Sequence, residues 1–160
     1  YGYCASKNET YYGFKGHLLI DGNGTITQCT LTQAHASERE AVFELTDKIH
    51  GVLLADKGYL GSDFKQTLKY KGIVLETPIR SNMQDHLSKS YRTLLNNKRR
   101  TVETVIGQLV DRFSIAKVRA RKIWHLTNRI TRKLLSHSMG IFANRTMGNF
   151  TMELENVLAT

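Results

Sequence analysis

At residues 52–59 the chain reads VLLADKGY, a continuous apolar run that stops abruptly at Asp56. Such a run is typical of a short strand that is buried on both faces of a sheet, so Asp56 is expected at the carboxyl end of that strand. A helical pattern with Phe64 and Leu68 follows, and residues 73–75 read IVL, a second buried strand. The connection is long enough for a parallel crossover, so this segment predicts a βαβ unit.

The residues before this unit predict a hairpin and a helix. Tyr11–Ile20 and Thr25–Leu31 are rich in aromatic and β-branched residues and are separated by the turn signal DGNG, residues 21–24. We therefore expect an antiparallel hairpin. Ser37 and Glu40 have the spacing of a capping box, and apolar residues then recur at helical intervals, so a helix of about three to four turns is expected.

The residues after Pro78 read as helices. Apolar positions recur at helical intervals in three groups: Leu87, Tyr91 and Leu94; Val102, Ile106, Leu109 and Phe113; and Leu126, Ile130, Leu134 and Ile141. Strands first, then a βαβ unit, then helices predict an α/β fold in which helices flank a mixed sheet. Because the chain has a single Pro and no low-complexity tract, we expect one domain over residues 1–145 and a C-terminal tail over residues 146–160.

The composition is that of a globular protein, with 41% hydrophobic and 23% charged residues. No apolar run approaches the ~20 residues that a membrane-spanning helix needs. The first residues contain neither a start methionine nor an apolar secretory signal, so the chain is expected to be cytoplasmic and incomplete at its start. Cys4 and Cys29 lie far apart without a second pair, which favours reduced thiols over a disulfide framework or a zinc site.

The positive charge is concentrated in one segment. The net charge is +9, and the residues from Arg80 to Arg145 alone contribute +12, from 15 Lys or Arg against three Asp or Glu. Concentrated positive charge on a folded domain is the electrostatic footprint of a protein that binds the phosphate backbone of nucleic acid. A solvated basic surface without a partner is the other interpretation of the charge alone.

Two carboxylates stand in positions suited to metal binding. Asp56 follows the expected strand, and Glu103 lies in a helical pattern. Hard divalent cations such as Mg²⁺ take oxygen ligands, commonly one or two carboxylates together with substrate phosphates. Two structural interpretations are also open, because Asp56 can cap the following helix and Glu103 can pair with Arg99 one turn away.

A set of short motifs gives the chain a resemblance to a known family. In chain order these are YGFKGH at residues 12–17, Gly24, Ala34 with Glu38, ADKGY at residues 55–59, and Arg99 with Glu103 four residues later. This ordered set, spread over roughly Tyr3 to Phe142, resembles the transposases of bacterial insertion sequences. The nearest branch resembles insertion-sequence family nine-eight-two, within the broader DDE group.

The resemblance implies a ribonuclease H-like fold in which three carboxylates bind two divalent ions, Mg²⁺ or Mn²⁺, and DNA strands are cut or rejoined. Asp56 matches the second carboxylate and Glu103 the third. The first is expected on a strand that precedes Tyr11, upstream of this chain, so we expect the catalytic domain to be truncated at its N-terminus. Asp21 is the nearby acid, but it sits in a Gly-rich turn, where Asp is favoured for backbone reasons.

The resemblance and the charge together indicate which residues contact DNA. In the family pattern Tyr-x-x-Arg-x-x-x-Glu followed by Lys, Arg99 is matched, whereas Asn96 and Val110 occupy the Tyr and Lys positions. We expect Arg112 or Lys117 to supply the missing positive charge. The complete set of expected DNA-binding residues is Lys57, Arg99, Arg100, Arg112, Lys117, Arg119, Arg121 and Lys122.

Two aromatic residues and one histidine have alternative interpretations. Tyr59 and Trp124 can stack on unpaired bases, although packing in a core or against a partner is the commoner role of such residues. Tyr59 is therefore a candidate site residue. His17, in the middle of an expected strand, is interpreted as structural, because metal sites of this class favour oxygen donors.

The leading hypothesis is a bacterial transposase that acts in the cytoplasm on the ends of its element and on target DNA, without membrane association. A homodimer in the DNA complex is a further hypothesis. The alternative is a non-catalytic, DNA-binding remnant of such an enzyme, and a third hypothesis is a ribonuclease H-like nuclease with another role. Because the first carboxylate is not matched, we expect these 160 residues to bind DNA without cutting it.

Overall fold

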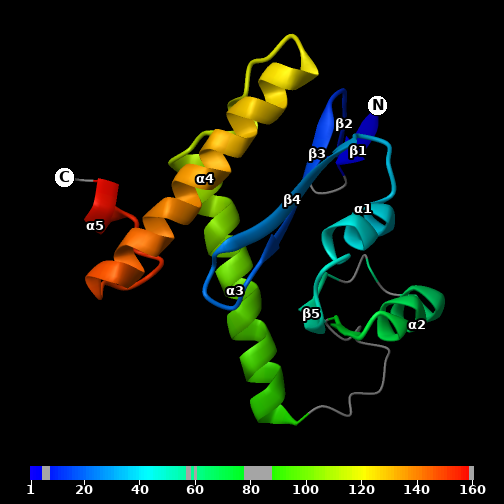
Figure 1. Cartoon of the computed structure of the whole chain (residues 1–160). Helices are drawn as coiled ribbons and strands as arrows, with labels where there is room; N and C mark the ends of the chain where they lie inside the picture. The colour runs from blue at the N-terminus through cyan, green and yellow to red at the C-terminus, as the bar shows by residue number, and fades with distance from the viewer. Residues whose placement is uncertain (5–7, 57–58, 60, 78–87, 159–160) are drawn as a thin grey trace. The chain divides into compact units, whose positions relative to one another are not determined.

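The computed structural model describes residues 1–4, 8–56, 59, 61–77 and 88–158 (Figure 1). The chain forms two compact units, each with buried apolar residues of its own. Unit 1 comprises Tyr1–Leu18 and Cys29–Leu95, and unit 2 comprises Leu19–Gln28 and Asn96–Thr160. Helices and strands are both present, which confirms the α/β class.

Unit 1 contains the expected βαβ unit. Strand β5 (Gly51–Leu54), helix α2 (Ser62–Tyr70) and strand β6 (Ile73–Glu76) follow one another along the chain. The two strands are parallel, with Leu53 opposite Leu75. The prediction is therefore confirmed in the type, order and direction of its elements.

Helix α1 (Glu38–Leu45) precedes this unit and is shorter than the three to four turns expected. Ser37 occupies the N-cap as predicted, but its side chain makes no capping hydrogen bond. At the other end, the hydroxyl of the buried Thr46 donates to the carbonyl oxygen of Val42 at 2.7 Å. This bond satisfies a buried polar group at the C-cap, where the helix ends.

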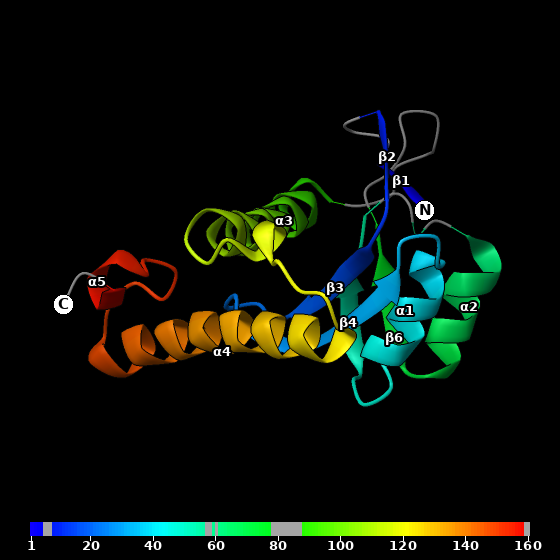
Figure 2. The same cartoon turned by 90° about the horizontal axis from the view of Figure 1, so that it is seen from above.

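Helices α1 and α2 cover one face of the β5–β6 pair (Figure 2). The core between them consists of Val42, Phe64, Leu68, Ile73 and Leu75. The opposite face carries Val52 and Val74, which lie opposite each other and are 61% and 47% exposed. The expectation that these strands are buried on both faces is therefore wrong, because both helices pack against the same face.

Strands β3 (Phe14–Ile20) and β4 (Ile26–Gln33) form the expected hairpin. The Asp21 carboxylate closes its turn by accepting hydrogen bonds from the backbone N–H of Asn23 at 2.8 Å and of Thr25 at 2.9 Å. This geometry confirms that Asp21 serves the backbone of the turn.

An additional hairpin lies before β3. Strands β1 (Gly2–Cys4) and β2 (Glu9–Tyr11) are antiparallel, with Gly2 opposite Tyr11. The sequence predicts a single strand from Tyr11 onward, whereas β2 ends there and Tyr12 and Gly13 separate it from β3. In the described residues, parallel and antiparallel pairing both occur, but in separate two-stranded sheets rather than in one mixed sheet.

Helices account for most of unit 2 (Figure 1). They are α3 (Lys89–Asp111), whose first residues belong to unit 1, α4 (Ile123–Met147) and the short α5 (Glu155–Leu158). Helix α4 confirms the last predicted helix. Helix α3 is continuous where two helices are predicted, because neither Gly nor Pro interrupts it before Gly107, and Leu87 lies outside the described residues. No described helix has both the length and the apolarity needed to cross a membrane.

The buried face of α3 is displaced from the predicted stripe. Val105 and Leu109 are buried, whereas Val102 and Ile106 are exposed. The prediction is therefore correct at Leu109 and wrong at the two exposed positions. The reason is that α4 packs on the side of α3 that carries Gln108, where the two helices share a hydrogen bond between Gln108 and His137.

Residues 149–158 pack against the helices of unit 2. Leu154 is 1% exposed, and one of its methyl carbons lies 2.8 Å from where a Cβ atom on Gly140 of α4 would stand. The Gln108 amide donates to the carbonyl oxygen of Met152 at 2.6 Å, and the Asn144 amide donates to that of Glu153 at 2.8 Å. Whether a separate tail begins at residue 146 stays a prediction.

Leu154→Ala should lower the free energy of unfolding by ~2–5 kcal/mol, because it empties a buried site in unit 2. Urea titration followed by circular dichroism measures this. Phe150→Ala is the matched control in the same segment, since Phe150 is 78% exposed and its loss should change stability by about 0.5 kcal/mol or less. Equal effects of the two substitutions would show that residues 149–158 are not anchored by Leu154.

His137 is the buried titratable group of unit 2. Its Nε2 lies 2.9 Å from the side-chain oxygen of Gln108, to which it donates, and its Nδ1 is buried without a hydrogen-bond partner among the described residues. Burial lowers the pKa of His137 below the ordinary value for histidine. A proton on Nδ1 would place an unpaired positive charge in the core, so the folded state favours the neutral ring.

This lowered pKa predicts a direction for the pH dependence of stability. The unfolded chain binds a proton at about pH 6.5, and the folded chain binds it only at lower pH. The contribution of His137 is therefore complete above about pH 6.5 and is lost as the pH falls from there through the folded pKa. Urea titrations between pH 7.5 and about pH 5 should show a shallower loss of stability for His137→Gln, while the exposed control His125→Gln keeps the original slope. A slope unchanged by His137→Gln would contradict this assignment.

Candidate carboxylate site and nucleic-acid interface

Asp56 lies where strand β5 ends, as the sequence predicts. The backbone N–H of Ala55 still donates to the carbonyl oxygen of Glu76 at 3.0 Å, so pairing with β6 continues to the residue before Asp56. The N–H of Tyr59 then donates to the carbonyl oxygen of Asp56 at 3.0 Å, which begins a turn. The Asp56 side chain is exposed at the carboxyl end of a parallel pair, where open α/β sheets place ligands.

Tyr59, the residue that closes this turn, belongs to the packing of unit 1. Its ring stacks on that of Phe64 with 6.3 Å between centroids and contributes to the apolar cluster beneath α2. Burial raises the pKa of the Tyr59 hydroxyl above its ordinary value. The Tyr59 ring thus packs within unit 1, which is the commoner role of such residues, and its contact with a base stays a prediction. Lys57 lies outside the described residues.

Glu103 lies on α3 with its side chain exposed. Arg99 lies one turn earlier on the same side of the helix, and Arg100 is its exposed neighbour. Asp56 and Glu103 belong to different units, so a shared cleft for the two carboxylates stays a prediction.

The oxygen donors of both residues suit a hard divalent cation. No cluster of three or more His, Cys, Asp or Glu side chains able to hold a metal ion occurs among the described residues. Asp21, the acid nearest to the expected first position, is engaged by two N–H groups of its turn. His17 donates to or accepts from the Thr32 hydroxyl at 2.8 Å, and burial lowers the pKa of His17, both of which fit a structural histidine.

Several basic residues of unit 2 hold its structure together. Arg112, expected to contact DNA, forms an ion pair with Glu155 of α5. Arg129 of α4 donates to the carbonyl oxygen of Arg119, and Lys133 donates to that of Phe113. These contacts tie the connection between α3 and α4 to the side of α4. No local pattern in the sequence predicts the contacts of Arg129 and Lys133, because their partners are carbonyl oxygens 10 and 20 residues away.

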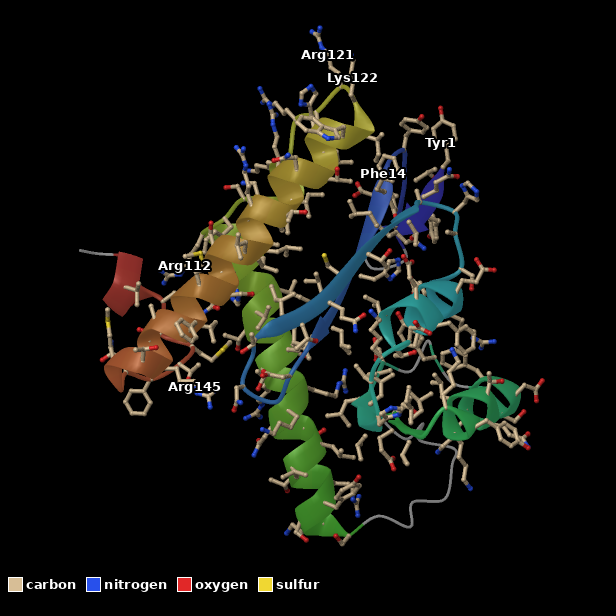
Figure 3. All side chains as sticks on the ribbon, viewed as in Figure 1. Tyr1, Phe14, Arg112, Arg121, Lys122 and Arg145 are labelled. Atoms are coloured by element: carbon tan, nitrogen blue, oxygen red, sulfur yellow. The ribbon has the colours of Figure 1, made fainter. Side chains whose placement is uncertain are left out.

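The basic residues of the α3–α4 connection itself are exposed. They are Lys117, Arg119, Arg121 and Lys122, and we call them the basic loop. Figure 3 shows Arg121 and Lys122 at the tip of the connection, with their side chains directed away from the helices. The four side chains of the basic loop are thus exposed, whereas the charged ends of Arg112, Arg129 and Lys133 contact other protein atoms.

The first turn of α4 follows the basic loop directly and carries an exposed indole. Trp124 is 66% exposed, and its ring meets the His125 ring edge to face, with 5.1 Å between centroids and an interplanar angle of 77°. Ile123 beside it is also exposed. Trp124 is therefore not a core residue of unit 2.

Comparison with known proteins gives one family match. The model of the transposase DDE domain matches residues 4–123, which is most of the chain and includes both Asp56 and Glu103. A search of curated proteins and a search of solved structures found no match. Because the family model covers well over half of the chain, this protein belongs to the family of transposases with a DDE domain.

Proposed function

We propose that this chain is the catalytic part of a bacterial insertion-sequence transposase, of the branch called family nine-eight-two, with Asp56 and Glu103 as its second and third metal-binding carboxylates. Membership of the DDE family already implies an enzyme that binds DNA, has a ribonuclease H-like fold and uses divalent metal ions. The observation that carries the finer proposal is the exposed Asp56 at the carboxyl end of β5, inside the matched residues.

The two carboxylates have the chemistry that Mg²⁺ or Mn²⁺ requires. Each offers oxygen ligands on a regular element, a strand end for Asp56 and a long helix for Glu103. A pair of such ions, when bound, polarises the scissile phosphate and activates a water or a 3′-hydroxyl for in-line attack. The chain then has to hold its carboxylates in place and keep the DNA backbone beside them, and it needs no nucleophile of its own.

The basic loop is proposed to hold the DNA backbone. Its four side chains are exposed, and those of Arg121 and Lys122 point away from the protein, so they can approach phosphates. Unit 2 as a whole has twelve Lys or Arg against five Asp or Glu, a net charge of +7, whereas unit 1 has eleven against nine. Phosphate contacts of this kind give affinity without base sequence information.

Replacing Arg119, Arg121 and Lys122 together by Gln should weaken binding of duplex DNA and reduce its salt dependence. The slope of log affinity against log salt concentration should fall by about 0.9 for each phosphate that is no longer neutralised, or roughly 2.7 for three. Fluorescence anisotropy with a labelled duplex measures both quantities. The matched control replaces Lys48, Lys65 and Lys69 of unit 1 by Gln, which removes the same charge from other exposed positions. Equal decreases in both variants would show that total charge, not the basic loop, determines binding.

Asp56→Asn and Glu103→Gln should each reduce Mg²⁺-dependent strand cutting more than about 100-fold, since substitutions outside a metal's ligand shell already cost 10–100-fold. Cutting is assayed on labelled element-end DNA, with the 160-residue chain and with a version extended by the residues encoded ahead of Tyr1. We expect only the extended version to cut. Binding of Mn²⁺, followed by electron paramagnetic resonance, should weaken in the same two variants.

Asp63→Asn and Asp111→Asn are the controls, because both remove an exposed carboxylate, near the start of α2 and at the end of α3. They should leave cutting unchanged. Cutting that survives both Asp56→Asn and Glu103→Gln would show that other residues bind the metal. If the extended version binds DNA and Mn²⁺ yet never cuts, the alternative of a non-catalytic DNA-binding remnant is correct.

A further inference from the structure

We infer that Trp124 is a stacking platform for an unpaired DNA base whose phosphates are held by the basic loop. This inference rests on the proposed DNA-binding role of unit 2 and specifies which form of DNA that surface takes. It combines three features of the described residues: an exposed indole, four exposed cations directly before it in the chain, and a connection that is tied down by contacts with α4.

The exposed indole of Trp124 indicates a ligand more strongly than the exposed side chains of smaller residues do. An indole has one of the largest apolar surfaces among side chains, and leaving it in water forgoes the free energy of burying it. Trp124 is nevertheless 66% exposed, although α4 offers a buried face elsewhere along its length. Its ring also contacts that of His125 in an edge-to-face arrangement.

The surroundings of Trp124 favour a nucleic acid over a protein partner. Lys117, Arg119, Arg121 and Lys122 are all exposed and lie within seven positions before the indole. Lysine and a high density of like charge are unusual at the centre of protein–protein interfaces. Cationic side chains interleaved with aromatic rings are the usual surface for single-stranded nucleic acid, because cations follow the backbone while rings stack on bases.

The ligand of Trp124 should be an unpaired base rather than a duplex, because only an unpaired base has an accessible face. In a duplex, each base face is already covered by its neighbours, so an indole at the protein surface can stack only where a base is free or has been unstacked. The connection is also preorganised, since Arg129 and Lys133 hold the carbonyl oxygens of Arg119 and Phe113. Ordering it on binding should therefore cost little conformational entropy.

The experiment uses the fact that Trp124 is the single tryptophan of the chain, so the intrinsic indole fluorescence reports on this residue alone. The 160-residue chain is titrated with a short oligothymidylate, with an abasic strand of the same length, and with a closed duplex that has no free ends. Anisotropy of labelled versions measures binding separately. Oligothymidylate should bind and quench the indole, whereas the abasic strand should bind through its phosphates without comparable quenching.

Three variants test the role of the ring. Trp124→Ala should weaken oligothymidylate binding roughly 5- to 150-fold and leave binding of the abasic strand almost unchanged. Trp124→Phe keeps an aromatic face and should retain most of the affinity. Ile123→Ala is the matched control, because it removes an exposed apolar side chain next to Trp124 and should change neither measurement.

Three other results would overturn the inference, and they distinguish a failure of base stacking from a failure of DNA binding by unit 2. Equal quenching by the abasic strand or by the closed duplex would show that no unpaired base stacks on Trp124, while DNA binding by unit 2 would stand. Equal affinities of Trp124→Ala and the unchanged chain for oligothymidylate would lead to the same conclusion. Failure of all three nucleic acids to bind would remove both the stacking role and the proposed DNA contact of the basic loop.

Discussion

The side-chain amide of Gln108 connects three segments of unit 2 that are far apart in the sequence. Its nitrogen donates to the carbonyl oxygen of Met152 at 2.6 Å, and its oxygen accepts from His137 at 2.9 Å. Because polar groups taken out of water are costly to leave unpaired, this pair of bonds favours the observed pairing of α3 with α4 and with residues 149–158. The α3–α4 connection, which carries the basic loop, is held separately, by the contacts of Arg129 and Lys133 with the carbonyl oxygens of Arg119 and Phe113.

Charge in unit 2 has two different uses. Arg112, Arg129 and Lys133 place their charged ends on Glu155 or on backbone carbonyl oxygens, and so stabilise the fold. The four cations of the basic loop are exposed and remain accessible to phosphates. Charge counting along the sequence does not separate these uses, since it assigns Arg112 and Lys117 the same role.

The sequence predicts those parts of the molecule that depend on neighbouring residues. The turn at Asp21, the βαβ unit and α4 follow from turn chemistry and apolar periodicity over a few residues, and they place Asp56 at a strand end. Other features depend on contacts between distant residues: the buried face of α3 depends on His137, and the packing of Leu154 depends on Gly140. Neither contact has a local signal. The ordered set of motifs predicts the DDE family, which the match over residues 4–123 confirms, whereas the branch within that family stays a prediction.

In the proposed function, the exposed carboxylates and the strongly positive unit have separate roles, so DNA cutting and DNA binding should be lost separately. Asp56 and Glu103 carry negative charge, so under the proposed function a divalent cation would neutralise them where a phosphate approaches. The proposed phosphate contacts of the basic loop differ, because the field of its cations extends over about 8–10 Å at physiological salt and requires no metal. Substituting a carboxylate by its amide makes the net charge more positive than +9, so such a variant should bind DNA at least as well as the original. A loss of cutting in that variant would then point to the proposed metal ligands and not to weaker association with the substrate.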